Sequence, residues 1–143
     1  NSLAGIYKLG EKKLAEFIKP SGFYRQKAKY LFGLAEFVVN RGGLRKIIKE
    51  PTDKLRKEFL DLKGVGPETA DSILLYALDK PVFVIDEYTR RLIKSKLYEV
   101  RLRKIQSGEF SYEKLQKLFE QNLKQDWRLY QDFHALSIID AKT

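Results

Sequence analysis

The sequence predicts an all-α fold in a single helical domain over residues 1–143. Apolar residues recur at helical spacing along almost the whole chain, and proline and glycine interrupt that spacing where helices are expected to end. The chain has no internal repeat, no low-complexity tract and no linker long enough to divide it. Its 143 residues, 43% of them hydrophobic, are enough to bury one core.

The first half of the chain divides into helices at proline and glycine. Ser21 has an N-cap side chain and is expected to start the helix that contains the apolar stripe Tyr24 to Val39. Arg41-Gly42-Gly43 is expected to end that helix. The other helices expected here span 11–19, stopped at Pro20, then 44–49 as a turn or short helix, and 51–60.

The clearest helix of the second half begins at Pro67, since proline in a first turn lacks only an N–H that would be unpaired there. Asp79-Lys80-Pro81 ends it, and the apolar segment Val82 to Ile85 is expected to be buried. The apolar face of this helix is expected to consist of Ala70, Ile73, Leu74, Ala77 and Leu78. Helices are also expected at 87–97, 111–123 and 127–141, with a loop at Ser107-Gly108.

Composition narrows the class of protein and of partner. The net charge of +9, with a pI of about 9.6, favours an anionic partner such as nucleic acid, with solubility alone as the alternative reading. The chain has no Cys and one His, which excludes disulfides and argues against a zinc site or a Cys-ligated iron–sulfur cluster. No apolar run approaches the roughly 20 residues of a membrane span, so a cytoplasmic, nucleoid-associated protein is expected.

The segment Leu62 to Gly66, LKGVG, lies between two amphipathic helices and has the form of a phosphate-binding hairpin. Its glycines can adopt positive φ and bring backbone N–H groups close to a ligand. The following helix adds free N–H groups and the positive end of its dipole. The residues expected to hold a DNA phosphate are Lys63, Gly64, Gly66 and Thr69. The alternative is a tight turn that uses glycine only because its geometry requires it.

The stretch Leu62 to Arg91, LKGVGPETADSILLYALDKPVFVIDEYTRR, resembles the signature of the helix-hairpin-helix DNA glycosylases, the superfamily of endonuclease III and the 3-methyladenine glycosylases. GFYRQKAKYL and YQDFHALSII resemble two other segments of that family and stand in the same order. The resemblance implies hairpin amides that hold a phosphate beside the lesion, and the family's essential aspartate at the position of Asp86. It also implies a monovalent cation, Na⁺ or K⁺, held by the backbone carbonyls of Leu60, Leu62 and Val65.

Asp86 follows a buried apolar segment and begins a helix. In the chemistry that the resemblance implies, loss of the base builds positive charge on the sugar. A carboxylate below the ring stabilises that charge and helps to orient or deprotonate the attacking water. The alternative is that Asp86 simply caps the helix 87–97. The two roles are compatible.

Glu68 is the informative departure from the family pattern. Relatives that also cut the DNA backbone have at this position a lysine whose amine attacks the sugar and forms a Schiff base. A glutamate cannot do this, and the chain has no cysteine to bind an iron–sulfur cluster such as that of endonuclease III. The resemblance therefore implies a monofunctional glycosylase that requires no cofactor. Glu68 also has a plainer reading as a first-turn acid favoured by the helix dipole.

Several other residues have two readings. The candidate DNA contacts are Arg25, Lys27, Arg90 and Arg91. Charges such as these commonly form a solvated helix face instead. His134, on the apolar side of the last helix, is read as a half-buried core residue rather than an active-site one, and Trp127 is also read as core.

With the resemblance, the sequence predicts a base-excision-repair DNA glycosylase, most like the bacterial 3-methyladenine enzymes, with alkylated purines as the expected substrate. The expected partner is double-stranded DNA containing a damaged base, and the protein is expected to be a monomer without membrane contact. Because the chain begins at Asn1, the N-terminal helices of the family, with much of the base pocket, are expected to be missing. The alternatives are an endonuclease III-like glycosylase and lyase acting on oxidised or mismatched bases, and a non-catalytic module that only grips DNA.

Overall fold

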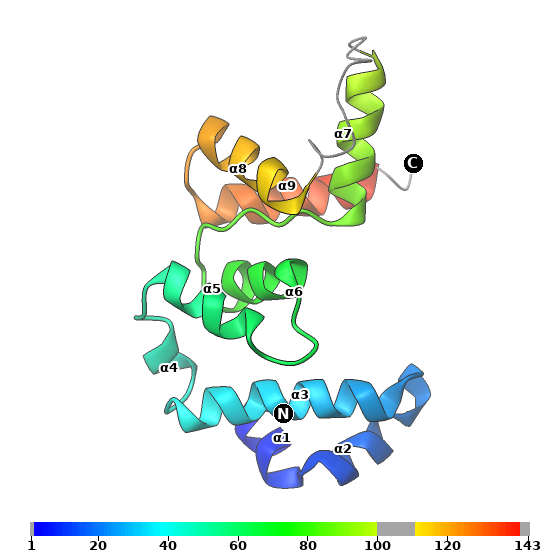
Figure 1. Cartoon of the computed structure of the whole chain (residues 1–143), viewed down its shortest axis with the longest axis vertical. Helices are drawn as coiled ribbons and strands as arrows, with labels where there is room; N and C mark the ends of the chain where they lie inside the picture. Colours follow the sequence, from blue (N-terminus) through cyan, green and yellow to red (C-terminus); the bar gives the residue numbers. More distant parts are fainter. Residues whose placement is uncertain (1, 100–110, 141–143) are drawn as a thin grey trace. The chain divides into compact units, whose positions relative to one another are not determined.

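The computed structural model describes residues 2–99 and 111–140, and within these residues it contains helices and connecting segments but no strand (Figure 1). The predicted all-α class is confirmed. The chain forms two compact units, unit 1 over Asn1–Gly66 and unit 2 over Pro67–Thr143. That residues 1–143 act as one domain stays a prediction, and the loop expected at Ser107-Gly108 lies outside the described residues.

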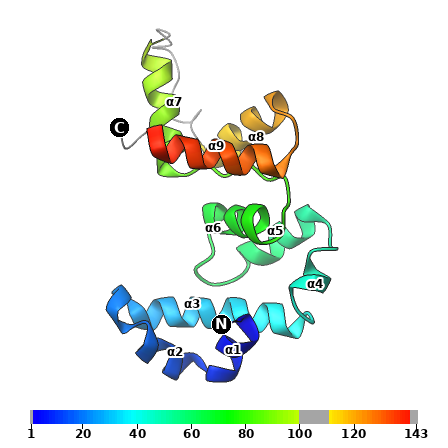
Figure 2. The ribbon, with the colours of Figure 1, turned by 180° about the vertical axis from the view of Figure 1, so that it is seen from behind.

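Unit 1 is built on one long helix, α3 (Tyr24–Asn40), against which two short helices pack, α1 (Leu3–Leu9) and α2 (Glu11–Phe17). Both short helices lie along the same side of α3 in the two opposite views (Figures 1 and 2). The remaining elements are η1 (Lys19–Ser21), α4 (Leu44–Ile47) and α5 (Thr52–Leu60). The buried apolar side chains of unit 1 are Leu14, Ala28, Ala35, Val38, Ile47, Leu55 and Phe59.

The two ends of α3 test the expected helix signals. The start does not follow the prediction, because Ser21 belongs to the 3₁₀ turn η1 and α3 begins after Phe23 without a side-chain cap. The end follows it closely: the Gly43 N–H donates to the Val38 carbonyl at 2.9 Å and the Gly42 N–H donates to the Val39 carbonyl at 2.9 Å. This pair of bonds is a Schellman motif, which requires a left-handed residue, and Gly42 has φ of 81°.

Unit 2 places helices around an extended segment. Its described helices are α6 (Pro67–Ser72), the π-helical turn η2 (Ile73–Ala77), α7 (Glu87–Glu99), α8 (Tyr112–Asn122) and α9 (Trp127–Asp140). The segment Val82 to Ile85 runs beside α8 and α9, and all four of its residues are buried, as predicted (Figures 1 and 2). The Phe83 ring stacks on Phe119, with ring centroids 4.3 Å apart. Packing against α8 and α9 therefore holds the segment in place.

The helix after the hairpin departs from the predicted α-helical face. Residues 73–77 form a π turn, in which hydrogen bonds close over five residues and the chain turns more slowly. Ala77 is exposed, whereas Leu75 and the polar Asp71 are buried, so the buried face is rotated from the predicted one. The turn ends where the Lys80 N–H donates to the Leu74 carbonyl at 2.9 Å. The spacing of apolar residues did not reveal this face, because one of its members, Asp71, is polar.

Candidate active site

Asp86 stands where the buried segment meets α7, and its carboxylate is the N-cap of that helix. The Thr89 N–H donates to Asp86 Oδ1 at 2.7 Å, which satisfies one of the free N–H groups of the first turn. The Asp86 side chain is 10% exposed. The capping role weighed from the sequence is therefore confirmed, and it uses only one of the two carboxylate oxygens.

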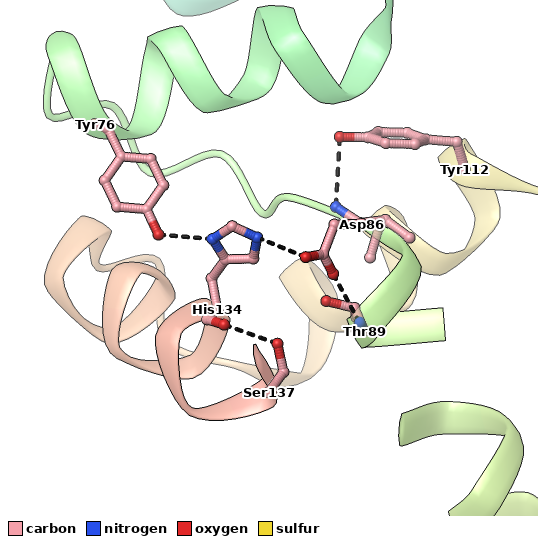
Figure 3. Close-up of polar contacts among 7 residues, drawn as sticks. Tyr76, Asp86, Thr89, Tyr112, His134 and Ser137 are labelled. Atoms are coloured by element: carbon pink, nitrogen blue, oxygen red, sulfur yellow. Dashed lines mark hydrogen bonds and ion pairs between the residues drawn. The ribbon is translucent and has the colours of Figure 1, made fainter. Parts of the chain in front are cut away.

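His134 of α9 contacts the other oxygen. Its Nε2 lies 3.1 Å from Asp86 Oδ2, and its side chain is 13% exposed (Figure 3). Ser137 donates from Oγ to the His134 carbonyl at 2.8 Å, on the next turn of the same helix. The reading of His134 as a half-buried residue is right about its burial. However, the contact between its ring and the candidate catalytic carboxylate was not predicted.

Tyr76 of η2 extends these contacts, since its hydroxyl lies 2.6 Å from His134 Nδ1 (Figure 3). An ionised carboxylate only accepts hydrogen bonds, so the proton between His134 and Asp86 belongs on Nε2. A neutral imidazole then accepts the Tyr76 proton at Nδ1. Burial raises the pKa of Tyr76, and the nearby Asp86 charge raises it further, which favours the phenol as that donor. Asp86 thus receives one donor on each oxygen.

The π turn and α9 are joined at two points one helical turn apart on α9. Gln131 donates from Nε2 to the Leu75 carbonyl at 3.0 Å, which satisfies a backbone acceptor of the π turn. His134, three residues later, receives the Tyr76 hydroxyl. π turns are frequent at functional sites. The position of this one beside Asp86 and His134 is therefore consistent with a functional site there.

The hairpin in unit 1 is fixed by a close contact at one glycine. Gly64 has φ of 85°, and a Cβ at this position would lie 2.3 Å from the Tyr30 ring. Gln26 donates to the hydroxyl of the same tyrosine. Gly66 differs, since it lies outside the left-handed region and a Cβ there would meet no atom within 4 Å. Positive φ therefore applies only to Gly64, while the backbone at Gly66 faces open space.

The other residues predicted at the hairpin are accessible. Lys63, Glu68 and Thr69 are all exposed, and Glu68 lies in the first turn of α6. The Leu62 carbonyl accepts the Val65 N–H at 3.1 Å, which leaves a second lone pair on that oxygen. Carbonyl oxygens of this kind fit a monovalent cation, but the cation stays a prediction. The hairpin ends unit 1, and Asp86 belongs to unit 2.

The predicted DNA-contacting cations have partners near them in sequence. Lys27 donates from Nζ to the Ser21 carbonyl at 2.6 Å, and Arg25 lies over the Tyr24 ring at 5.7 Å. Arg91 pairs with Glu87 at 3.2 Å across one turn of α7, with both side chains exposed. Arg90 is half-buried. The roles of these four residues stay predictions.

Phe23 in unit 1 is an unusual residue that was not singled out from the sequence. Phe23 is 87% exposed and has φ of 45°, in the left-handed region that bulky residues rarely adopt. Arg25 follows two residues later and is also exposed. Strained backbone of this kind is concentrated at functional sites. Phe23 belongs to the segment GFYRQKAKYL, in which no role was assigned to it from the sequence.

Within residues 2–99 and 111–140, no group of three or more His, Cys, Asp or Glu side chains is placed to hold a metal ion. The whole sequence contains no cysteine, so these 143 residues supply no thiolate to a cluster. In the same described ranges no helix has the length and hydropathy of a membrane span.

Comparison with known proteins places this geometry in a family. The family model described as "HhH-GPD superfamily base excision DNA repair protein" matches residues 1–125. The chain belongs to this superfamily. Its hairpin and its Asp86 lie within the matched range, as the sequence resemblance implied, and the resemblance to the endonuclease III and 3-methyladenine glycosylase group is confirmed.

Two curated proteins that are similar to this chain support the same family. A Methanocaldococcus jannaschii protein named as a candidate DNA repair glycosylase is 42% identical over 140 residues, which cover 96% of this chain and 60% of the relative. Endonuclease III of Thermotoga maritima is 34% identical over 110 residues, covering 77% of this chain and 47% of the relative. The chain therefore spans about half to three fifths of these curated relatives.

A solved structure is also similar. The crystal structure of the H. pylori 3-methyladenine DNA glycosylase bound to 1,N6-ethenoadenine matches with a TM-score of 0.74 and 31% sequence identity. The match covers 99% of this chain and 68% of that one. The fold of this chain is therefore similar to that of this glycosylase over the matched residues.

Proposed function

We propose that this chain is the hairpin-bearing and aspartate-bearing part of a DNA glycosylase that hydrolyses the N-glycosidic bond of a damaged base, with Asp86 as the catalytic residue. The observation that carries the proposal is the arrangement of one nearly buried carboxylate held by a donor on each oxygen, the Thr89 N–H and His134 Nε2. Membership of a base-excision-repair superfamily supports the reaction class.

The chemistry follows from the charge of this carboxylate. As the bond between the sugar carbon and the base nitrogen breaks, its electron pair leaves with the base and the sugar becomes cationic. Asp86 would stabilise that cation and direct a water molecule to the sugar carbon. The water loses one proton as the new C–O bond forms, and the carboxylate can accept it. Two fixed donors keep Asp86 in one orientation, so little reorganisation is needed during the reaction.

The hairpin would hold the DNA backbone without reading sequence. The open backbone around Gly66 and the exposed Lys63 and Thr69 offer N–H groups, a hydroxyl and a positive charge to a phosphate. The exposed ring of Phe23 has the apolar character of side chains that enter a base stack where a nucleotide has been flipped out. Arg25 and Lys27 would add charge on the same segment.

We further propose that the reaction stops at the abasic site, with alkylated purines as substrate. Glu68, in the first turn of α6, occupies the position at which lyase relatives have a lysine, and a carboxylate cannot form a Schiff base. An alkylated purine carries positive charge and leaves readily, so Asp86 needs no partner that protonates the base. Similarity to an enzyme named for 3-methyladenine supports this substrate class.

The test is single-turnover release of methylated bases from methylated duplex DNA by the wild type and by Asp86→Asn. Asparagine caps helices as well as aspartate does, so α7 should stay folded. We expect a rate loss of about 10²- to 10³-fold from removing a charge of this kind, with an unfolding free energy changed by less than about 1 kcal/mol. The assay is run on the 143-residue chain and on a chimera. In the chimera, the parts of the M. jannaschii relative that lie outside the alignment are joined to this chain.

The products distinguish the alternatives. Strand breaks that appear only after alkali are expected for a monofunctional enzyme. Breaks before alkali, with a borohydride-trapped covalent complex, would instead identify an endonuclease III-like lyase. Equal DNA binding by both proteins, without base release by either protein or by the chimera, would leave a phosphate-gripping module in which Asp86 serves only as a cap.

A further inference from the structure

One backbone edge of the extended segment that precedes Asp86 faces α8. In an extended chain the N–H and C=O of one residue point to the same side, and so do those of the residue two positions on. Phe83 and Ile85 therefore present their backbone groups on a common edge. In a sheet, a neighbouring strand would pair with that edge, but the described residues contain no strand.

Side chains of α8 form hydrogen bonds with the backbone groups on this edge, as a neighbouring strand would in a sheet. Glu120 Oε1 accepts the Phe83 N–H at 2.9 Å, and Gln116 Nε2 donates to the Phe83 carbonyl at 2.8 Å. The Tyr112 hydroxyl accepts the Ile85 N–H at 3.4 Å (Figure 3). These three residues are spaced by four, so they lie along one face of the helix. We name them the α8 ladder: Tyr112, Gln116 and Glu120.

Gln116 is the central member, and a buried carboxylate holds it. Gln116 is 8% exposed, and its Nε2 also donates to Asp71 Oδ2 at 2.7 Å. Both protons of the amide are then used, one on Asp71 and one on Phe83. Asp71 is fully buried and belongs to α6. The amide thus links α6, α8 and the segment that ends at Asp86.

We propose that the α8 ladder, and Gln116 above all, positions the catalytic carboxylate. The ladder residues fix the backbone of Phe83 and Ile85, and Ile85 is joined to Asp86 by a peptide bond. The inference rests on the proposed function for its effect on rate, but its structural content stands separately. Side chains at i, i+4 and i+8 of one helix hold the segment in a single register, because each pairs with a different backbone group.

The main test replaces Gln116 by leucine, which keeps the apolar bulk and removes both donors. Gln121→Leu is the matched control, since Gln121 is an exposed glutamine on the same helix. We expect Gln116→Leu to lower the single-turnover rate of base release at saturating enzyme by about 10- to 100-fold, as misplacement of a reacting group does, with DNA affinity unchanged. In the same variant, amide hydrogen exchange at Phe83 and Ile85 should become faster. Gln121→Leu should change neither quantity.

A second pair of variants keeps the test decisive if Gln116→Leu does not fold. Glu120→Gln retains an oxygen that can accept the Phe83 N–H and should behave as the wild type, whereas Glu120→Leu should lose rate and amide protection together. Unchanged rate and unchanged exchange in folded Gln116→Leu or Glu120→Leu would overturn the proposal. If neither the wild type nor the chimera releases base, the proposed function fails, and exchange at Phe83 and Ile85 alone decides whether the ladder holds the segment.

Discussion

The hairpin in unit 1 and the Asp86 site in unit 2 present their chemistry in different ways. The hairpin offers backbone groups from consecutive residues, and its turn closes with a bond between Val65 and Leu62. The Asp86 site brings together side chains 48 and 58 residues apart, His134 with Asp86 and His134 with Tyr76. One site is a local conformation that glycine permits, whereas the other exists only when three elements pack together.

The two sites are expected to be sensitive to different kinds of substitution. Because the hairpin uses backbone, a substitution affects it through steric fit and φ, as at Gly64. Because the Asp86 site uses side-chain donors and acceptors, a substitution affects it through lost hydrogen bonds. The hairpin should therefore respond mostly in stability and DNA affinity, and the Asp86 site mostly in rate. Three predictions test this division and a fourth concerns the pH dependence of stability; they follow in decreasing order of expected size.

Gly64→Ala should destabilise the protein strongly, and Gly66→Ala should not. At Gly64 the new methyl would clash with the Tyr30 ring in a left-handed backbone, at a cost of about 2–4 kcal/mol. At Gly66 it would enter open space, with a change within about 1 kcal/mol. Urea unfolding of both variants measures the difference. Equal losses would mean that the close approach of Gly64 to Tyr30 does not determine hairpin stability.

His134→Leu should slow base release by about tenfold, or about 1.4 kcal/mol in the barrier, because Asp86 loses the donor to Oδ2. His134→Gln is the matched variant, since its amide can still donate to the carboxylate and should recover most of the rate. Single-turnover kinetics at saturating enzyme, with DNA affinity measured in parallel, separates the two. A loss confined to affinity would place His134 in DNA binding instead.

Lys63→Ala should weaken DNA binding without changing the rate at saturating enzyme. If Lys63 neutralises one phosphate, the slope of log affinity against log salt should fall in magnitude by about 0.9. The exposed Lys57 of α5 provides a matched control, as Lys57→Ala, at a site assigned no phosphate. Identical slopes for wild type and Lys63→Ala would remove Lys63 from the interface.

The smallest expected effect concerns two tyrosines in unit 2. Burial raises the pKa of Tyr76, helped by Asp86, and burial raises that of Tyr130, helped by Glu120. A raised folded-state pKa contributes stability that is full below the unfolded value, about 10, and is lost as pH rises through the folded value. Stability should therefore decline above about pH 10, and less steeply in a Tyr76→Phe/Tyr130→Phe variant.

Tyr130→Phe alone supplies a control at neutral pH. The Tyr130 hydroxyl is buried and has no hydrogen-bond partner among the described residues. Removing an unsatisfied buried hydroxyl should be neutral or slightly stabilising, by less than about 1 kcal/mol. Thermal unfolding at pH 7 measures this. A clear loss of stability would mean that the hydroxyl has a partner outside the described residues.

Features that depend on residues close together in the chain could be predicted from the sequence. The all-α class, the glycine-terminated end of α3, the start of α6 at Pro67, and the buried segment before Asp86 all follow from local rules of capping, φ and hydrophobic spacing. The superfamily was also evident from the sequence, because its signature is a continuous stretch that includes both the hairpin and Asp86.

Features that depend on packing between distant elements could not be predicted in this way. The π turn at 73–77 was not predicted, and one of its carbonyls, that of Leu75, accepts a hydrogen bond from Gln131 of another helix. The 3₁₀ turn that displaced the expected Ser21 cap was likewise invisible. His134 was predicted to be a core histidine, because its position on an apolar helix face indicates burial and nothing about its hydrogen-bond partners. Which polar group meets a half-buried ring depends on how distant elements pack, and hydrogen bonds are short and directional enough that sequence spacing does not specify them.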